Sequence, residues 1–267
     1  MIFTTKNIQD INLKKYKRLI TIGCSFTNYL WETWADLLAY EMPQAEYINV
    51  GQSGAGQIYM VAQLNQAMNK LNLSQDDLVC IMWSTYYRDD RYLDNGWVTP
   101  GNIYTQNVYP MDYVMKFYTP RGMAIRDLAL IDTTSRMLEN VNFDVLMTMS
   151  MPLTKHEAEG SHQQFLNENM EDVYMLYNNI DKNMLPSIFH SPVLPNGFEH
   201  TFKFEWNGEL FHDHHPTTTK YCEYLLYLGI PISEECQQHA KECDVRSSKI
   251  KNREHFSKSI QASTRFL

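Results

Sequence analysis

The chain has 267 residues, of which 44% are hydrophobic and 20% charged, a composition typical of a globular protein with a substantial core. Its formal net charge of −8 argues against broad binding to nucleic acid or to an anionic membrane. No apolar run approaches the roughly 18 residues of a membrane-spanning helix, and the run at 19–24 is too short for a signal-peptide core. The five cysteines are odd in number and lack paired CxxC spacing, which argues against a disulfide framework or a zinc site. We therefore expect a soluble, cytoplasmic protein.

Short apolar runs alternate with helical patterns through the first 150 residues. The runs are continuous, and continuous apolar runs favour strands of a parallel sheet that is covered on both faces. The predicted strands are 19–23, 47–50, 78–83 and 143–149, and the predicted helices are 34–41, 58–71 and 123–138. This order predicts an α/β fold with a doubly wound parallel sheet, in which ligands bind at the carboxyl ends of the strands.

Residues 88–120 interrupt this rhythm. They contain glycines and prolines, with tyrosines scattered among them, and we interpret them as a Tyr-rich insertion that is mostly loop. Aromatic side chains of this kind are found in substrate-facing lids, where they stack on sugar rings or flat acyl groups, and equally in packed insertions or subunit interfaces. The sequence leaves these alternatives open.

The second half of the chain gives weaker patterns. Residues 165–177 favour a helix, 202–211 favour a strand or hairpin, and 217–228 favour a helix that begins after a proline and threonines. The last 30 or so residues are polar. We expect a single domain over 1–230, followed by a polar C-terminal tail at 231–267, which is helical or loose.

Three segments place reactive or small residues at strand ends or at the start of a helix. Segment 22–27 carries Ser25 directly after the first predicted strand, where a hydroxyl and free backbone N–H groups can face a ligand. Segment 49–56 carries several glycines, which permit a tight turn and close approach of the backbone to a substrate. Segment 212–216 sets a carboxylate and an imidazole two residues apart before the last predicted helix.

Together and in this order, the three segments resemble the blocks of the SGNH (GDSL-like) hydrolase family. Gly23-Cys24-Ser25-Phe26-Thr27 resembles the first block, with Cys24 where Asp is usual. Asn49-x-Gly51-x-Ser53-Gly54 is similar to the second block, and Asp213-x-His215-Pro216 is similar to the last. The resemblance covers 18–90 and 205–229 and implies a flavodoxin-like three-layer sandwich with a parallel sheet.

The resemblance also implies a catalytic triad. Ser25 would be the nucleophile, His215 the general base, and Asp213 the group that orients and stabilises the imidazole. The backbone N–H groups of Ser25 and Gly54 would form the oxyanion hole. Such an arrangement is chemically sound, because a serine hydroxyl is a poor nucleophile until an imidazole accepts its proton, and the tetrahedral oxyanion then needs preorganised donors.

One block of the family has no counterpart in this chain. The family supplies an Asn after the third strand as an oxyanion donor, whereas segment 83–88 here reads WSTYYR. Ser84, Tyr86 or Arg88 would donate in its place, or the third donor is missing. In addition, the last block is a compact Asp-x-His, where the family more often has one more residue between the two.

From these residues we predict an ester hydrolase that acts through an acyl-serine intermediate without a metal or organic cofactor. The expected partner is a small-molecule or glycan ester, with short acyl groups such as O-acetyl favoured. An acyltransferase on the same fold and a catalytically silent binding protein remain alternatives. Cys24 is interpreted as a small packed residue, and the histidines of 212–215 as a catalytic loop in preference to a metal site. The oligomeric state is not predicted.

Overall fold

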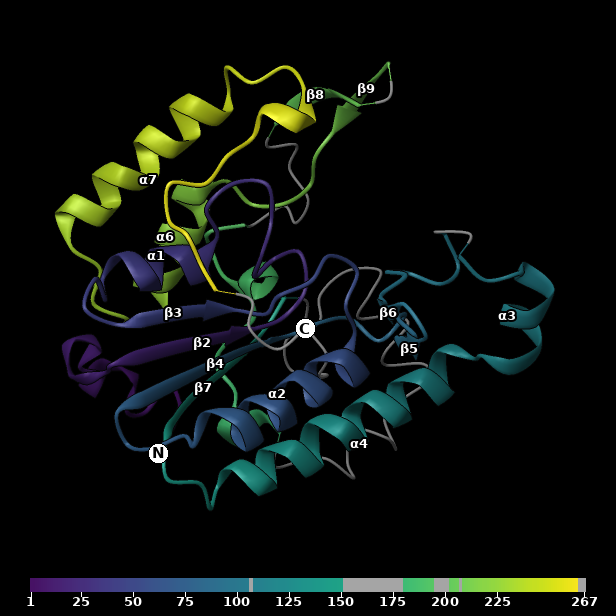
Figure 1. The fold of residues 1–267 in the computed structure, drawn as a ribbon, viewed down its shortest axis with the longest axis horizontal. Coiled ribbons are helices and arrows are strands. Elements are labelled where there is room, and N and C mark those ends of the chain that lie inside the picture. Colours follow the sequence, from purple (N-terminus) through teal and green to yellow (C-terminus); the bar gives the residue numbers. More distant parts are fainter. Residues whose placement is uncertain (106–107, 151–179, 195–201, 207, 264–267) are drawn as a thin grey trace.

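Five parallel strands form the centre of the molecule, in the order β1-β7-β4-β2-β3 (Figure 1). The computed structural model describes residues 1–105, 108–150, 180–194, 202–206 and 208–263. The strands of this sheet are β1 (Ile2–Phe3), β2 (Arg18–Ile22), β3 (Glu46–Asn49), β4 (Asp77–Trp83) and β7 (Asp144–Met149). Apart from the short edge strand β1, the chain order of neighbouring strands follows the 2-1-3-4 pattern of a doubly wound sheet. The fold is therefore α/β with a parallel sheet, as predicted.

Helices cover both faces of this sheet (Figure 1). The helices are α1 (Trp34–Tyr40), α2 (Gln57–Leu71), α3 (Met111–Phe117), α4 (Pro120–Leu138), α6 (Thr218–Tyr227) and α7 (Glu234–Ser247). Helices α2 and α4 contact each other on one face, and α1, α6 and α7 contact one another on the other face. None of the described helices is both long and apolar enough to cross a membrane.

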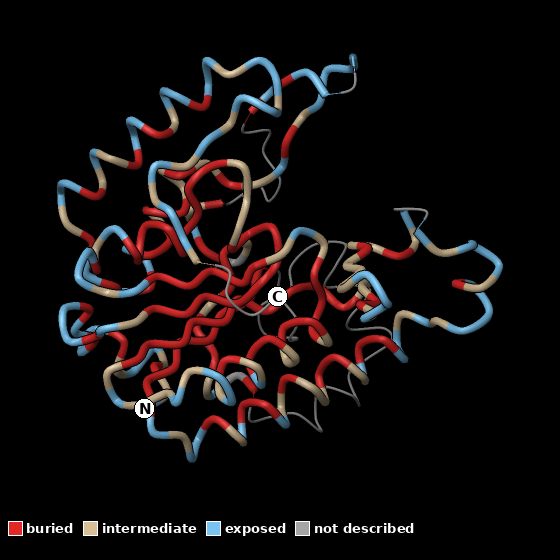
Figure 2. Tube along the Cα trace, viewed as in Figure 1, coloured by how far each residue is buried: buried red, intermediate tan, exposed pale blue. Residues whose placement is uncertain are grey.

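The core lies between the sheet and these two helical layers. All seven residues of β4 are buried, as are all six of β7, which agrees with the continuous apolar runs that predicted them. Figure 2 shows the buried residues concentrated on the central strands and on the sheet-facing sides of the helices. Thr21 pairs with Asn49 and Ile22 with Ile81, so the carboxyl ends of β2, β3 and β4 lie at the same edge of the sheet. The loops that follow these strands therefore meet there.

The helices begin at caps that the sequence supplies. The Asp90 carboxylate accepts the backbone N–H groups of Gly56 (2.9 Å) and Tyr59 (3.0 Å) at the start of α2. The Thr217 hydroxyl accepts the N–H of Lys220 at the start of α6. Helix α4 begins at Pro120, three residues before the predicted start, because Thr119 caps it and proline suits the first helical position.

The insertion at 88–120 contains more regular structure than the glycines and prolines predicted. It forms an antiparallel hairpin of β5 (Arg91–Leu93) and β6 (Gly96–Val98), followed by the short helix α3. Helix α3 lies at the far end of the insertion, away from the central sheet (Figure 1). The expected strand or hairpin at 202–211 is a hairpin of β8 (Lys203–Trp206) and β9 (Glu209–His212). The helix predicted at 165–177 lies outside the described residues.

The polar C-terminal segment is packed against the domain over its described residues. Helix α7 buries Cys236, Ala240 and Cys243. Farther on, the Lys258 ammonium forms an ion pair of 2.8 Å with Asp36, whose side chain is almost fully buried. Ser263 exchanges backbone hydrogen bonds with residues of β3 and so extends the sheet edge. This segment is consequently part of the fold and does not extend away from it as a loose tail.

Candidate active site

A cavity of about 430 Å³ opens at the carboxyl edge of the sheet, where the loops after β2 and β3 meet the loop before α6. Ser25, Gly54 and His215 all border it, so three segments far apart in the sequence converge on one space. The walls also include the loop at 99–102, aromatic residues of the β8–β9 hairpin, and two arginines, Arg88 and Arg253. This is the position at which ligands bind in open parallel sheets.

Ser25, His215 and Asp213 form a continuous hydrogen-bonded chain. The Asp213 carboxylate lies 2.9 Å from His215 Nδ1, and Nε2 of the same ring lies 2.8 Å from Ser25 Oγ. A carboxylate only accepts hydrogen bonds, so Nδ1 carries the proton of the neutral ring and the Ser25 hydroxyl donates to Nε2. The backbone N–H of His215 also donates to the same Asp213 oxygen, at 2.7 Å. The compact Asp-x-His spacing therefore allows the contact that the triad requires.

The side chain of Tyr29 supports this chain, although Tyr29 lies outside the three sequence motifs. Its ring stacks on the His215 imidazole with centroids 3.7 Å apart and planes 21° apart, and its hydroxyl donates to Asp213. Phe26 contacts the same imidazole, with centroids 4.8 Å apart. The Trp31 indole N–H donates to the carbonyl of Pro216 at 2.9 Å, which fixes the chain directly after the histidine. The aromatic residues after Ser25 thus hold the imidazole in place.

The electrostatics of the triad favour an ionised Asp213. Burial acts to raise the pKa of this carboxyl, but hydrogen bonds and charge attraction from His215 and a hydrogen bond from Tyr29 hold it below its ordinary value. The pKa of Tyr29 is raised, first by burial and then by the charge of Asp213. Tyr29 therefore stays protonated and donates, and Asp213 accepts from three groups at once.

The Ser25 loop depends on a glycine and on a turn. A side chain at Gly23 would place its Cβ 2.0 Å from Thr27 Oγ1, which is impossible without moving the loop. The carbonyl of Cys24 accepts the N–H of Thr27 at 2.9 Å and closes the turn that carries Ser25. The Cys24 side chain is fully buried in the core, in keeping with its interpretation as a packed residue.

Hydrogen bonds and close backbone contacts fix the conformation of the loop that carries Gly54. The Asn49 amide accepts the N–H of Gly51 and donates to the carbonyl of Thr27, so it links the second loop to the first. Gly54 has φ +78°, a conformation that favours glycine, and a Cβ there would lie 2.3 Å from the Thr99 carbonyl oxygen. Neither the Gly54 N–H nor the Ser25 N–H donates to any residue in the described part of the chain. Both are free to meet a ligand.

The three residues expected to replace the family Asn lie in different surroundings. Ser84 and Tyr86 are fully buried, and neither borders the cavity. Arg88 does border it, with Nη1 donating to the carbonyl of Ala55 at 2.6 Å. Of the three, only Arg88 is in a position to reach a substrate.

Asn102 supplies a second candidate donor that sequence reasoning missed. It borders the cavity from the insertion, and its Oδ1 accepts the backbone N–H of Tyr104 at 3.0 Å. Because Oδ1 is the acceptor, the two Nδ2 hydrogens face the other way, and they donate to no described residue. The preceding Gly101 donates its N–H to the carbonyl of Gly54 at 3.0 Å. Asn102 is thus tied to the second loop of the site by backbone contacts.

The tyrosines of the insertion form a separate network. The Arg91 guanidinium donates hydrogen bonds to the hydroxyls of Tyr113 and Tyr118, and it forms an ion pair of 2.9 Å with Asp89. Asp89 also pairs with Arg126 of α4, at 2.9 Å. These tyrosines tie the insertion to the helical layer. The parts of the insertion that border the cavity are Arg88 and the loop 99–102, and no tyrosine is among them.

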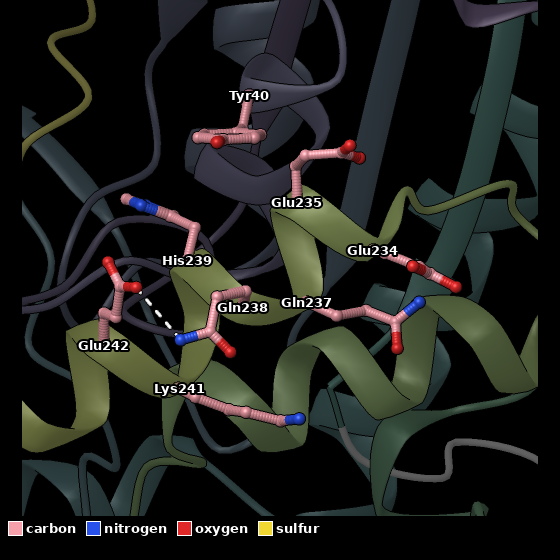
Figure 3. A pocket seen from close by; sticks show the side chains of 8 residues that line it. All are labelled: Tyr40, Glu234, Glu235, Gln237, Gln238, His239, Lys241 and Glu242. Atoms are coloured by element: carbon pink, nitrogen blue, oxygen red, sulfur yellow. Dashed lines mark hydrogen bonds between the residues drawn. The ribbon is translucent and has the colours of Figure 1, made fainter.

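A second surface depression lies at the end of α1, between Tyr40 and α7 (Figure 3). Beside it, ligand atoms of Glu32, His239 and Cys243 lie within 4.8 Å of one another, and this is the one group with metal-ligand spacing among the described residues. However, the Arg246 guanidinium lies 3.1 Å from the Cys243 sulfur and 3.4 Å from Glu32. A cation already occupies this position, so we do not assign a metal there.

Only His215 of the three clustered histidines borders the cavity, whereas His214 is exposed to solvent and His212 is part of β9. The arrangement of Ser25, His215, Asp213 and the free N–H groups is one that nucleophilic acyl chemistry requires. Comparison of the chain with known proteins returns neither a matching family model nor a matching curated sequence.

Proposed function

We propose that the protein is a serine ester hydrolase of the SGNH type, acting through an acyl-serine intermediate. The observation that carries this proposal is the hydrogen-bonded chain from Asp213 through His215 to Ser25, with its serine end at a cavity. A serine paired to an oriented imidazole is the signature of an activated nucleophile. The strand order of the sheet and the position of the site at its carboxyl edge support the same family.

Acylation begins when Ser25 Oγ attacks the ester carbonyl carbon while His215 Nε2 accepts the hydroxyl proton. The resulting oxyanion accepts hydrogen bonds from the N–H groups of Ser25 and Gly54, and from the Asn102 amide in the role of the family Asn. The bond to the alcohol oxygen then breaks, and His215 returns the proton to the leaving alcohol. In the second half, water attacks the acyl-serine while His215 Nε2 accepts its proton; the bond to Ser25 Oγ then breaks, His215 returns the proton to that oxygen, and the carboxylic acid is released.

The proposed substrate is a short acyl ester such as an O-acetyl group on a glycan. The cavity volume of about 430 Å³ lies within the range of sites for small molecules. Trp206 and Phe211 border it with exposed aromatic side chains on which a sugar ring can stack, and the buried Phe204 packs behind them. These residues belong to the β8–β9 hairpin, so the proposed sugar-binding wall comes from the hairpin and not from the Tyr-rich insertion.

A fluorophosphonate probe tests the proposal directly. Such a probe reacts with an activated serine, forming an oxygen–phosphorus bond and releasing fluoride. We expect peptide mapping by mass spectrometry to find the label on Ser25 alone. The Ser25→Ala variant should remain unlabelled, whereas Cys24→Ser should be labelled like the wild type, since the Cys24 side chain is buried.

The same preparations should be assayed with 4-nitrophenyl acetate. A burst of nitrophenol followed by slower turnover is expected of an acyl-enzyme. Absence of both labelling and turnover would favour a binding protein that retains the fold. Labelling on a different serine would move the nucleophile and refute the assignment of Ser25.

A further inference from the structure

The charged side chains that border the cavity contrast with the charge of the whole chain. The chain has a formal net charge of −8. Yet the described residues that line the cavity include Arg88 and Arg253 and no Asp or Glu. The nearby Asp213 is engaged by His215 and Tyr29. A cavity with this lining attracts an anion, because low-dielectric walls strengthen the field of the two guanidinium groups.

Arg253 is positioned in a way that leaves it available for a ligand. Its guanidinium lies over the Trp206 ring, with the central carbon 4.5 Å from the ring centroid. Stacking of this kind occupies the face of the guanidinium and leaves its N–H groups free at the edges. Arg253 forms no ion pair or hydrogen bond with the described residues through its side chain. A partly buried arginine without a carboxylate partner is suited to bind a carboxylate or phosphate of a substrate.

The segment around Arg253 is held against the hairpin. Glu205 of β8 pairs with Asn252 and donates its N–H to the carbonyl of Lys251 at 2.7 Å. Phe256 packs on Phe204 and on Trp31, with ring centroids 5.4 and 5.5 Å apart. The guanidinium therefore sits on an ordered part of the cavity wall.

This wall lies on the imidazole side of the site. Trp31, which contacts Phe256, also makes an edge-on contact with Tyr29, and Tyr29 stacks on His215. Arg88, by contrast, contacts Ala55, next to the Gly54 N–H. In the acylation step His215 must protonate the leaving alcohol, so the alcohol portion of the ester occupies the imidazole side. The acyl oxygen faces Gly54.

We propose that the substrate is an ester whose alcohol portion carries an anionic group, a carboxylate or a phosphate, bound by Arg253 while a ring of the alcohol stacks on the aromatic wall at Trp206. This inference rests on the proposed ester hydrolysis and narrows its substrate class. For a glycan ester, it selects an acidic sugar in place of a neutral one.

The test compares three acyl esters in the wild type. 4-Acetoxybenzoate carries the anion on the alcohol portion, its methyl ester is the neutral counterpart, and the 4-nitrophenyl ester of succinic acid carries the anion on the acyl portion. Each kcat/KM is divided by the spontaneous hydrolysis rate, because the leaving groups differ in acidity. We expect 4-acetoxybenzoate to be preferred over its methyl ester, and this preference to decrease as salt is added.

The Arg253→Gln variant should lower the ratio of kcat/KM for 4-acetoxybenzoate over its methyl ester by about tenfold or more, the range of one charge-assisted hydrogen bond. Arg253→Lys, which keeps the charge, should restore part of the ratio. The succinate ester should show no comparable change relative to the methyl ester. Lys249→Gln, which removes an exposed cation that lies four residues before Arg253 and does not line the cavity, is the matched control and should leave the ratio unchanged.

Binding measurements separate this inference from the proposed hydrolysis. 4-Hydroxybenzoate should bind the wild type more tightly than its methyl ester by calorimetry, and Arg253→Gln should remove the difference. Hydrolysis of all three esters without charge preference would overturn the inference and leave the esterase intact. Selective binding through Arg253 without hydrolysis would support the anion site and refute the esterase. Equal binding of the two ligands, with no effect of Arg253→Gln, would overturn the anion site.

Discussion

Tyr29 lies flat against the His215 imidazole, with ring centroids 3.7 Å apart, and its hydroxyl reaches behind the ring to donate to Asp213. One side chain therefore contacts two members of the triad by different means. The stack restricts the tilt of the imidazole, and the hydrogen bond helps to keep Asp213 ionised, because it lowers the pKa of a carboxyl that burial alone would raise. We therefore expect Tyr29 to act as a positioning residue for His215.

Two substitutions at Tyr29 separate these contributions. Tyr29→Phe keeps the stack and removes the hydrogen bond, and we expect kcat for 4-nitrophenyl acetate to fall by about tenfold, with little change in KM. Tyr29→Leu removes both and should reduce kcat further. Tyr40→Phe is the matched control, since Tyr40 stacks on His239 at a similar angle away from the cavity. A Tyr29→Phe variant that loses thermal stability in proportion to kcat would instead indicate a structural role.

The identity of the general base is tested by substituting the clustered histidines singly. We expect His215→Ala to lower kcat by about 10³-fold or more, leaving the catalysis supplied by binding and the oxyanion donors. His214→Ala should stay close to the wild type, because His214 is exposed and does not border the cavity. Asp213→Asn should be severe, since the imidazolium would lose the negative charge that stabilises it and an amide N–H could favour the wrong tautomer of the ring. An inactive His214→Ala with an active His215→Ala would contradict the assignment of the base.

The central sheet could be predicted from sequence because its signal is local. The four long strands are continuous apolar runs, and each was predicted to within about one residue of its observed bounds. Helix α3 was missed because its seven residues follow a proline within a stretch dominated by turn residues. The packing of the C-terminal segment was also missed, because it depends on long-range pairs such as Lys258 with Asp36, which no local pattern encodes.

The residues of the candidate site also fall into those that a local sequence pattern indicates and those that it does not. Ser25, Asp213 and His215 could be selected from sequence because each belongs to a short motif with its own spacing. Tyr29 and Asn102 could not, because their relation to the site is set by how loops fold over the sheet edge. One signal for Tyr29 was present in the aromatic residues at 29 and 31, close after the serine. For Asn102 the sequence offered only an asparagine after a Pro-Gly turn.

The role of Asn102 as an oxyanion donor predicts a loss confined to catalysis. Asn102→Ala should lower kcat by about 10²–10³-fold, the effect of removing one such donor. Asn102→Asp should be at least as severe, because it replaces the donor with a negative charge. Asn95→Ala, at an exposed position of the β5–β6 turn, is the control and should be neutral. If Asn102→Ala is neutral and Arg88→Gln loses activity, the third donor is Arg88.

Alanine substitution at two glycines with the same backbone conformation separates the cost of an unfavourable φ from the cost of steric crowding by the new Cβ. Gly54 and Gly208 have φ of +78° and +79°, but a Cβ at Gly54 would lie 2.3 Å from the Thr99 carbonyl oxygen, and at Gly208 it would meet no described atom within 4 Å. Both alanine variants should lose about 1 kcal/mol from the unfavourable φ. Gly54→Ala should lose more and should also lose activity, because the Thr99 loop must move. Urea unfolding together with kcat for 4-nitrophenyl acetate checks this, and equal effects in both variants would contradict the crowding argument.

The stability of the protein should depend on pH through Asp127 of α4. Its carboxyl is buried, and burial raises its pKa to about 7, although Arg126 donates to Oδ1 at 2.7 Å and opposes the shift. The other oxygen, Oδ2, has no hydrogen-bond partner among the described residues. Between about pH 4, near the pKa of an unfolded aspartate, and about pH 7, the native state therefore binds more protons than the unfolded state. The free energy of unfolding should fall as pH rises through this interval.

Asp127→Asn removes the titration and should flatten the dependence. Relative to the wild type, the variant should gain stability as pH rises from about 4.5 to about 7, by up to a few kcal/mol. Asp144→Asn is the control, because the pKa of Asp144 is shifted in the opposite direction. Burial acts to raise the Asp144 pKa, but hydrogen bonds from Lys15, the N-terminus and Tyr16 hold it below its ordinary value, so its contribution is lost only at lower pH and should stay constant over this interval. A difference between wild type and Asp127→Asn that does not change with pH would show that Asp127 is ionised throughout and that its pair with Arg126 outweighs burial.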